Sequence, residues 1–148
     1  SLPAVIRSLA GVEADGVAGL GKAFARLGER LPRRSVAIVI SDLMEEPEGW
    51  GASLGALASR GVDCRIVHLH DPGEWRLSQD KAVVLFSPED GSETPIEPAD
   101  ARSAMAEVVA EYLTEVRDIL GRNRCRHHLA PIDAPLDGLL AAVLDGRS

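Results

Sequence analysis

The sequence predicts an α/β fold of three layers, α/β/α, in which helices cover both faces of a mainly parallel sheet. Three apolar runs, at residues 35–40, 64–69 and 125–129, have the length and composition of buried strands. Segments with helical periodicity separate these runs. Strands that alternate with helices are joined by right-handed crossovers within one sheet, and such a sheet carries helices on both faces.

Apolar residues spaced three and four apart predict five helices. They cover about residues 2–9, 17–31, 45–60, 99–121 and 136–144. In the third helix, Pro47 suits the first turn and Gly61 suits the end, while Trp50, Leu54 and Leu57 form the stripe that we expect to be buried.

Residues 82–97 interrupt this alternation and predict a β-hairpin insertion. The two apolar segments Ala82–Phe86 and Glu93–Ile96 flank Asp90-Gly91, a dipeptide typical of hairpin turns. Pro95 has no backbone N–H, so its strand is expected at an edge.

Length and composition indicate one globular domain that spans residues 1–148 and has an aliphatic core. The chain is 45% apolar and 26% charged, but only 3% aromatic. Its net charge of −7 disfavours binding to nucleic acid or to an anionic membrane surface. We find no membrane-spanning run and no signal peptide. Cys64 and Cys125 make no disulfide framework, so we expect reduced thiols and a cytoplasmic location.

Candidate binding residues gather where two of the predicted strands end. They are Ser41, Asp42, Glu45, Glu46, Trp50 and Asp71. Ligands of open α/β sheets bind outside the carboxyl ends of the strands, so we expect these residues to form an interaction surface. For Asp42 alone, a loop or helix-cap carboxylate is favoured over a metal ligand.

Two further clusters allow a functional and a structural interpretation. His68 and His70 alternate along a strand beside Asp71, a pattern that can bind a transition metal. Because no further ligand is evident, ordinary strand-end histidines are favoured. Basic residues gather between Arg117 and His128, where the dipole of the preceding helix favours cations. If functional, that cluster would bind an acidic partner.

Catalytic motifs are absent from the sequence. No G-x-S-x-G elbow follows the end of a predicted strand, and there is no P-loop and no G-x-G-x-x-G after a strand. Both cysteines lie in apolar strands, where thiols are usually inert. We therefore expect that the protein is not an enzyme. The alternative is a small metal-dependent hydrolase that uses Asp42, His70 and Asp71 at the strand ends.

The order of several short motifs resembles the C-terminal half of a bacterial family. The motifs are an Ile-Ser-Asp-Leu strand end, a Glu-Glu-Pro helix start, Val-His-Leu-His-Asp-Pro, an Asp-Gly hairpin and a closing Pro-Leu-Asp-Gly-Leu-Leu helix. The family is domain of unknown function 58, whose core is similar to the von Willebrand factor A domain. This resemblance implies a partial von Willebrand A-like, Rossmann-like fold.

The resemblance also implies a metal-ion-dependent adhesion site, which binds Mg²⁺ in members that have it complete. Asp42 matches the Asp of its third loop. The Thr of the second loop falls near Val17 or Ala18, which cannot ligate a metal through their side chains, and the Asp-x-Ser-x-Ser motif is not in this chain. Because Mg²⁺ needs several oxygen ligands, we expect a degenerate site without metal or other cofactor.

The partners that the resemblance implies are proteins. It suggests a non-catalytic interaction module that works with a MoxR-type AAA ATPase in the assembly or maturation of other proteins. In the resembled fold, another strand lies beside residues 35–40. Without that strand, an uncharged apolar edge is left to pair with another chain, so we expect a homodimer.

Overall fold

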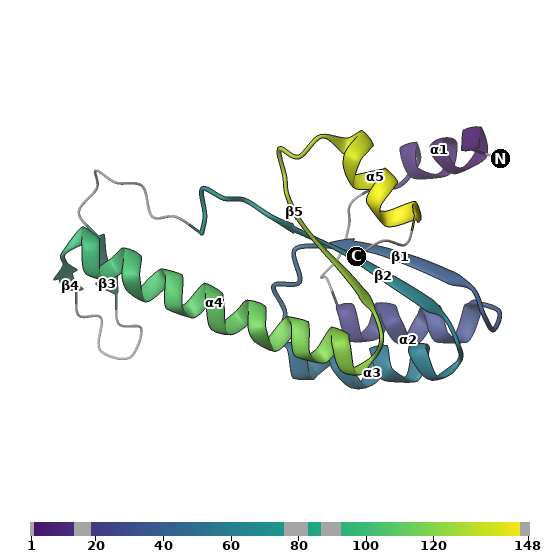
Figure 1. Cartoon of the computed structure of the whole chain (residues 1–148), viewed down its shortest axis with the longest axis horizontal. Coiled ribbons are helices and arrows are strands. Elements are labelled where there is room, and N and C mark those ends of the chain that lie inside the picture. Colours follow the sequence, from purple (N-terminus) through teal and green to yellow (C-terminus); the bar gives the residue numbers. More distant parts are fainter. Residues whose placement is uncertain (1, 14–18, 76–82, 87–92, 146–148) are drawn as a thin grey trace.

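The computed structural model describes residues 2–13, 19–75, 83–86 and 93–145. Its centre is a sheet of three parallel strands in the order β1-β2-β5 (Figure 1). The strands are β1 (Val36–Ser41), β2 (Asp63–His70) and β5 (Arg126–Pro131). The predicted parallel sheet is confirmed, and each strand ends within two residues of its expected position.

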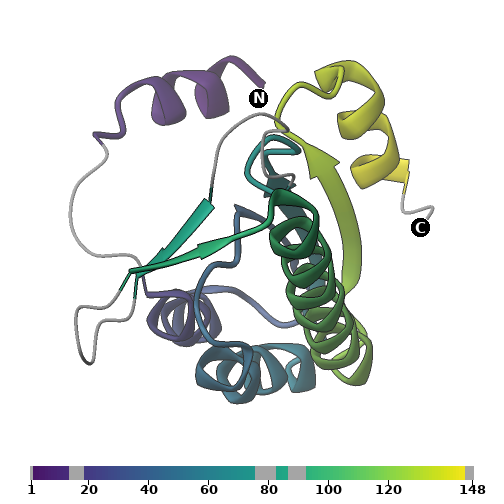
Figure 2. The ribbon, with the colours of Figure 1, turned by 90° about the vertical axis from the view of Figure 1, so that its left-hand side faces the viewer.

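The described residues form five helices, at the places that the sequence predicts. They are α1 (Leu2–Ala10), α2 (Leu20–Arg30), α3 (Pro47–Ser59), α4 (Pro98–Arg122) and α5 (Leu136–Asp145). Figures 1 and 2 show α2, α3 and α4 on one side of the sheet, with α1 and α5 on the other. Helices on both sides confirm the predicted fold class. In the described part of the chain, no helix combines the length and apolar content that crossing a bilayer requires.

The main core lies between the sheet and the helices α2, α3 and α4. Trp50, Leu54 and Leu57 of α3 are all buried here, as their spacing predicts. Cys64 and Cys125 are buried in the same cluster as free thiols. Gly61 follows α3 with a φ of 77°, a conformation that explains why the helix ends at a glycine.

A smaller cluster fixes α5 to the opposite face, over β2 and β5. Val143 of α5 packs against Val67 and Ala130. Arg65 of β2 strengthens this contact, because its guanidinium donates a 3.0 Å hydrogen bond to the carbonyl oxygen of Leu144 and pairs with Asp63 at 2.8 Å.

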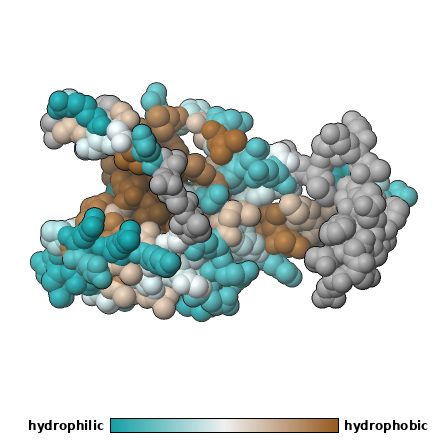
Figure 3. Space-filling model, turned by 180° about the vertical axis from the view of Figure 1, so that it is seen from behind, coloured by the Kyte–Doolittle hydropathy of each residue, from teal (hydrophilic) through white to brown (hydrophobic). Residues whose placement is uncertain are grey.

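The edge strand β1 is covered on one face only by the described residues. Val36, Ile38 and Ile40 are 53%, 45% and 64% exposed, respectively. The prediction that both faces of this strand are covered was therefore wrong. The reason is that α5 packs over β2 and β5, while the core helices cover the opposite face, which carries Ala37. Figure 3 shows a hydrophobic, hollowed area on this side of the molecule.

The hairpin insertion forms at the start of α4, away from the parallel sheet (Figures 1 and 2). Its strands β3 (Val83–Phe86) and β4 (Glu93–Ile96) pair antiparallel, with Val83 opposite Ile96. The predicted hairpin is confirmed, whereas its expected Asp90-Gly91 turn lies outside the described residues.

Candidate functional site

The loop after β1 is a tight turn stabilised by its own polar side chains. Leu43 is fully buried and has a φ of 53°. The Ser41 hydroxyl accepts a 3.1 Å hydrogen bond from the Leu43 N–H, and the Asp42 carboxylate accepts one of 3.4 Å from the Met44 N–H. The structure thus places Asp42 at the carboxyl end of the sheet, as a carboxylate that caps the turn.

Glu45 connects this loop to two helices. Its carboxylate accepts a 2.8 Å hydrogen bond from the Leu20 N–H at the start of α2, and its carbonyl oxygen accepts the Trp50 indole N–H at 3.2 Å. Trp50 is 0% exposed and packs against Phe24. The expectation that Trp50 belongs to an interaction surface was therefore wrong, because the helical stripe of α3 turns this side chain into the core.

The end of β2 is fixed by a turn and by aromatic packing. The Asp71 carboxylate accepts a 2.7 Å hydrogen bond from the Gly73 N–H, and this turn precedes Trp75. The Trp75 ring stacks on His70 with 4.1 Å between ring centroids. His68 is buried and makes edge contacts with Trp75 and with Tyr112 of α4. Asp71 and His70 therefore support the loop that carries Trp75.

His68 and His127 lie side by side on β2 and β5. Their nearest ring nitrogens, Nδ1 of His68 and Nε2 of His127, are 3.2 Å apart. Burial, followed by the charge of His127, lowers the pKa of His68 to about 4. Burial also lowers the pKa of His127, with a contribution from the Arg117 charge. Both rings are therefore neutral near pH 7.

Two arginines of the basic cluster form ion pairs with different aspartates. In the basic cluster, Arg126 pairs with Asp63 at 2.8 Å and Arg122 with Asp118 at 3.8 Å. Across residues 2–13, 19–75, 83–86 and 93–145, no three His, Cys, Asp or Glu side chains gather as possible metal ligands. The second-loop positions Val17 and Ala18 lie outside the described residues.

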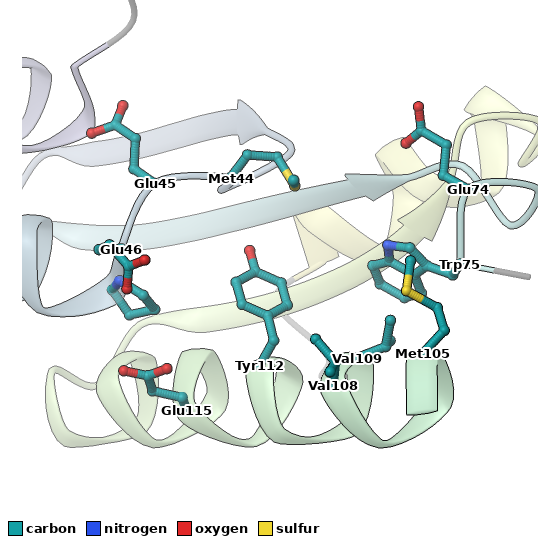
Figure 4. A pocket seen from close by; sticks show the side chains of 11 residues that line it. Met44, Glu45, Glu46, Glu74, Trp75, Met105, Val108, Val109, Tyr112 and Glu115 are labelled. Carbon is teal, nitrogen blue, oxygen red and sulfur yellow. The ribbon is translucent and has the colours of Figure 1, made fainter. Parts of the chain in front are cut away.

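A groove of about 470 Å³ opens where the carboxyl ends of the strands meet α4 (Figure 4). We call it the sheet-top groove. Its apolar lining consists of Met44, Pro47, Trp75, Met105, Val108, Val109 and Tyr112, and its acidic lining of Glu45, Glu46, Glu74 and Glu115. No basic side chain is among the described residues that line it.

The groove exists because α4 is longer than the sheet that it covers. A helix of 25 residues is about 38 Å long, whereas strands of six to eight residues span roughly 20 to 26 Å. The buried Val116 and Leu120 lie in the C-terminal part of α4, but Val108 is 61% exposed. Met44 is 76% exposed in the loop that faces α4.

Carboxylates crowd one end of the groove. Figure 4 shows Glu46 and Glu115 with their carboxylates near each other. Partial desolvation and then the charges of Glu48 and Glu46 raise the pKa of Glu115. Burial, followed by the charges of Asp42 and Glu115, raises the pKa of Tyr112 to about 12. The groove therefore combines an apolar floor with a strongly negative rim.

Comparison with known proteins places the chain in a family. The family described as Protein of unknown function DUF58 matches residues 1–115 of the 148. The chain belongs to this family. The match confirms the predicted family, DUF58. Among curated proteins and among solved structures, the comparisons found no match.

All the lining residues of the groove fall within the DUF58 match, yet the sequence prediction included only Glu45 and Glu46 among them. Met44, Trp75 and the residues of α4 were missed. A signal was present, because the apolar stripe of α4 continues to Met105, beyond what a six-residue strand can cover. The stripe served only to predict a helix over residues 99–121.

Proposed function

We propose that this DUF58 chain is a non-catalytic protein-interaction module whose partner docks in the sheet-top groove. The exposed apolar floor of the groove carries the proposal. Apolar patches rimmed by polar residues often mark protein-binding sites on soluble proteins. The place of the groove, beyond the carboxyl ends of parallel strands, is where α/β folds generally bind their ligands.

The walls of the groove are held by contacts behind them. The Tyr112 hydroxyl donates a 2.7 Å hydrogen bond to the Leu43 carbonyl oxygen, next to Met44. On the opposite wall, Trp75 stacks on His70. A surface fixed in this way loses little conformational entropy when a partner binds, which favours a docking role.

For the partner, we propose a MoxR-type AAA ATPase, with which the chain would act in the assembly or maturation of other proteins. The support is the resemblance of the motif order to a von Willebrand A-like family. Asp42, which matches a residue of the adhesion site in that resemblance, lies in the same turn as Met44. A docking surface at this turn therefore agrees with a degenerate adhesion site that binds protein without metal.

The proposal can be tested with purified components. Immobilised chain should retain a purified MoxR-type AAA ATPase, and the double variant Met44→Ser/Val108→Asn should weaken the interaction about tenfold, as expected when exposed apolar contacts are removed. Both residues are exposed, so the variant should melt at nearly the wild-type temperature.

Leu140→Ser is the matched control, because it removes an exposed apolar side chain from α5, away from the groove. Its binding should equal that of the wild type. Absence of wild-type binding would reject the ATPase partner. Equal binding by wild type and double variant would reject the groove as its docking site.

A further inference from the structure

The floor of the sheet-top groove has the pattern of a surface that takes a helix. Met105, Val108, Val109 and Tyr112 occur at i, i+3, i+4 and i+7 along α4, so they form one stripe of about two turns. Apolar grooves of this kind bind the matching stripe of an amphipathic helix. Met44 and Met105 lie on opposite sides of the groove, and their flexible thioethers can adapt to the shape of the partner side chains.

The rim determines which helix fits. Glu46 and Glu115 lie together at one end of the groove, and Glu74 lies beside Trp75 at the other (Figure 4). None of these three carboxylates takes part in the ion pairs found among the described residues. An acidic helix would bring like charges against them, and a neutral helix would desolvate them without compensation.

We propose that the groove binds a cationic amphipathic helix of a protein partner, with its apolar stripe on α4 and its Lys or Arg side chains at Glu46, Glu115 and Glu74. This inference rests on the proposed function and specifies the chemistry of the docked segment. Positive flanks complement the rim at both ends, while the apolar stripe fills the floor between them.

A defined peptide provides the first test. The probe is a fluorescein-labelled 18-residue peptide of Leu and Lys with the leucines at helical spacing. One comparison peptide has the same residues in scrambled order, and another has Glu in place of Lys. Fluorescence anisotropy with the full chain should show that the helical Leu/Lys peptide binds about tenfold tighter than either. Its affinity should fall as the salt concentration rises, because ions screen the rim.

Variants of the protein provide the second test. The charge reversal Glu46→Lys/Glu115→Lys should weaken binding of the Leu/Lys peptide about tenfold and strengthen binding of the Leu/Glu peptide. Val108→Asn should weaken binding of the Leu/Lys peptide several-fold, although it leaves the charges of the rim unchanged. Glu107→Lys is the control, because this exposed residue lies on another face of α4 and does not line the groove. Circular dichroism should show that all three variants fold.

The inference is overturned if the scrambled or the acidic peptide binds as well as the helical Leu/Lys peptide. It is also overturned if the charge reversal weakens binding of the Leu/Lys peptide no more than Glu107→Lys does, because the rim would then not be the site of binding. The same holds if Val108→Asn leaves binding of the peptide unchanged, because binding would then be an unspecific attraction between charges. The outcome is separable from that of the proposed function. If ATPase binding depends on Met44 and Val108 but the Leu/Lys peptide does not compete, the docking function stands and the cationic helix is rejected.

Discussion

The hydroxyl of Tyr112 donates a 2.7 Å hydrogen bond to the carbonyl oxygen of Leu43, and so joins the middle of α4 to the turn after β1. Leu43 has a φ of 53°, a left-handed conformation that costs a branched residue roughly 1 to 2 kcal/mol. The turn keeps this conformation because Leu43 is fully buried and its carbonyl is bound by α4. The position of Met44 at the groove therefore depends on Tyr112, which lies 69 positions after Leu43 in the chain.

Tyr112→Phe removes only this hydroxyl. Because the Leu43 carbonyl then loses its donor in a partly buried site, the free energy of unfolding should fall by about 1 kcal/mol. Urea denaturation measures the change. Thr114→Val is the control: its hydroxyl bonds within an exposed turn of α4, so its removal should have a smaller effect. Equal stability of Tyr112→Phe and wild type would show that the turn does not depend on α4.

The buried histidines predict that acid destabilises the fold. In the folded protein the pKa of His68 is about 4 instead of 6.5, and that of His127 is also lowered. Below pH 6.5 the unfolded chain therefore binds protons that the folded chain does not, so stability falls as the pH falls. For His68 alone the loss reaches at most about 3 kcal/mol near pH 4 and then levels off.

Urea denaturation between pH 7 and pH 4 measures this dependence. His68→Phe keeps an aromatic ring among Trp75 and Tyr112 but cannot titrate. Its stability should therefore depend less steeply on pH than that of the wild type. Identical slopes for the two proteins would contradict a neutral, buried His68.

Arg65 should control the attachment of α5. Arg65→Met removes the donor to the Leu144 carbonyl and leaves Asp63 paired with Arg126. We expect a loss of about 2 kcal/mol, together with faster hydrogen exchange in α5 than in α3. The control Arg122→Met breaks an exposed pair of 3.8 Å and should cost less than about 0.5 kcal/mol. Unchanged exchange in α5 would show that apolar packing alone holds this helix.

The open edge of β1 predicts self-association. Val36, Ile38 and Ile40 are exposed, and β1 carries no charged side chain that would discourage pairing with a second copy. Sedimentation at micromolar concentration should show a dimer, and Ile38→Lys should disperse it. Val108→Lys puts the same charge on an exposed apolar position of the groove and should leave the dimer intact. A stable wild-type monomer would disprove the prediction.

The turn after β1 predicts weak binding of divalent cations. Asp42 is the sole residue that the adhesion-site resemblance matches, and its carboxylate already accepts the Met44 N–H. Calorimetric titration with Mg²⁺ or Mn²⁺ should therefore show no saturable site below about millimolar concentration. Micromolar binding that is lost in Asp42→Ala would contradict this expectation.

The elements of the fold could be predicted because local signals determine them. Pro47 begins α3, Gly61 follows its end with the φ of 77° that glycine tolerates, and Trp50, Leu54 and Leu57 point into the core. The coverage of β1 could not be predicted from such signals. A continuous apolar run indicates two covered faces, but whether a helix lies over each face depends on where α5 docks, far along the chain.

The candidate site was predicted in part for the same reason. Asp42 and Glu46 lie near the carboxyl end of β1, as predicted. Their position could be predicted because the local apolar pattern of residues 35–40 shows where this strand ends. The floor of the groove comes from α4, whose stripe looks the same at the exposed Val108 as at the buried Val116. The spacing within the stripe does not separate the two; only a comparison of the length of the helix with the length of the strands does.

The buried cysteines give this DUF58 chain an internal reporter of its own opening. Cys64 and Cys125 are both buried, and hydrogen bonding to Cys64 together with burial raises the pKa of Cys125, which disfavours its reactive thiolate form. A thiol reagent in the solvent can therefore react only with molecules in which this part of the core has opened. The reaction rate then follows the population of open molecules. A change at the exposed Met44 or Val108 of the groove should leave that rate as it is, whereas any change that loosens the core should increase it.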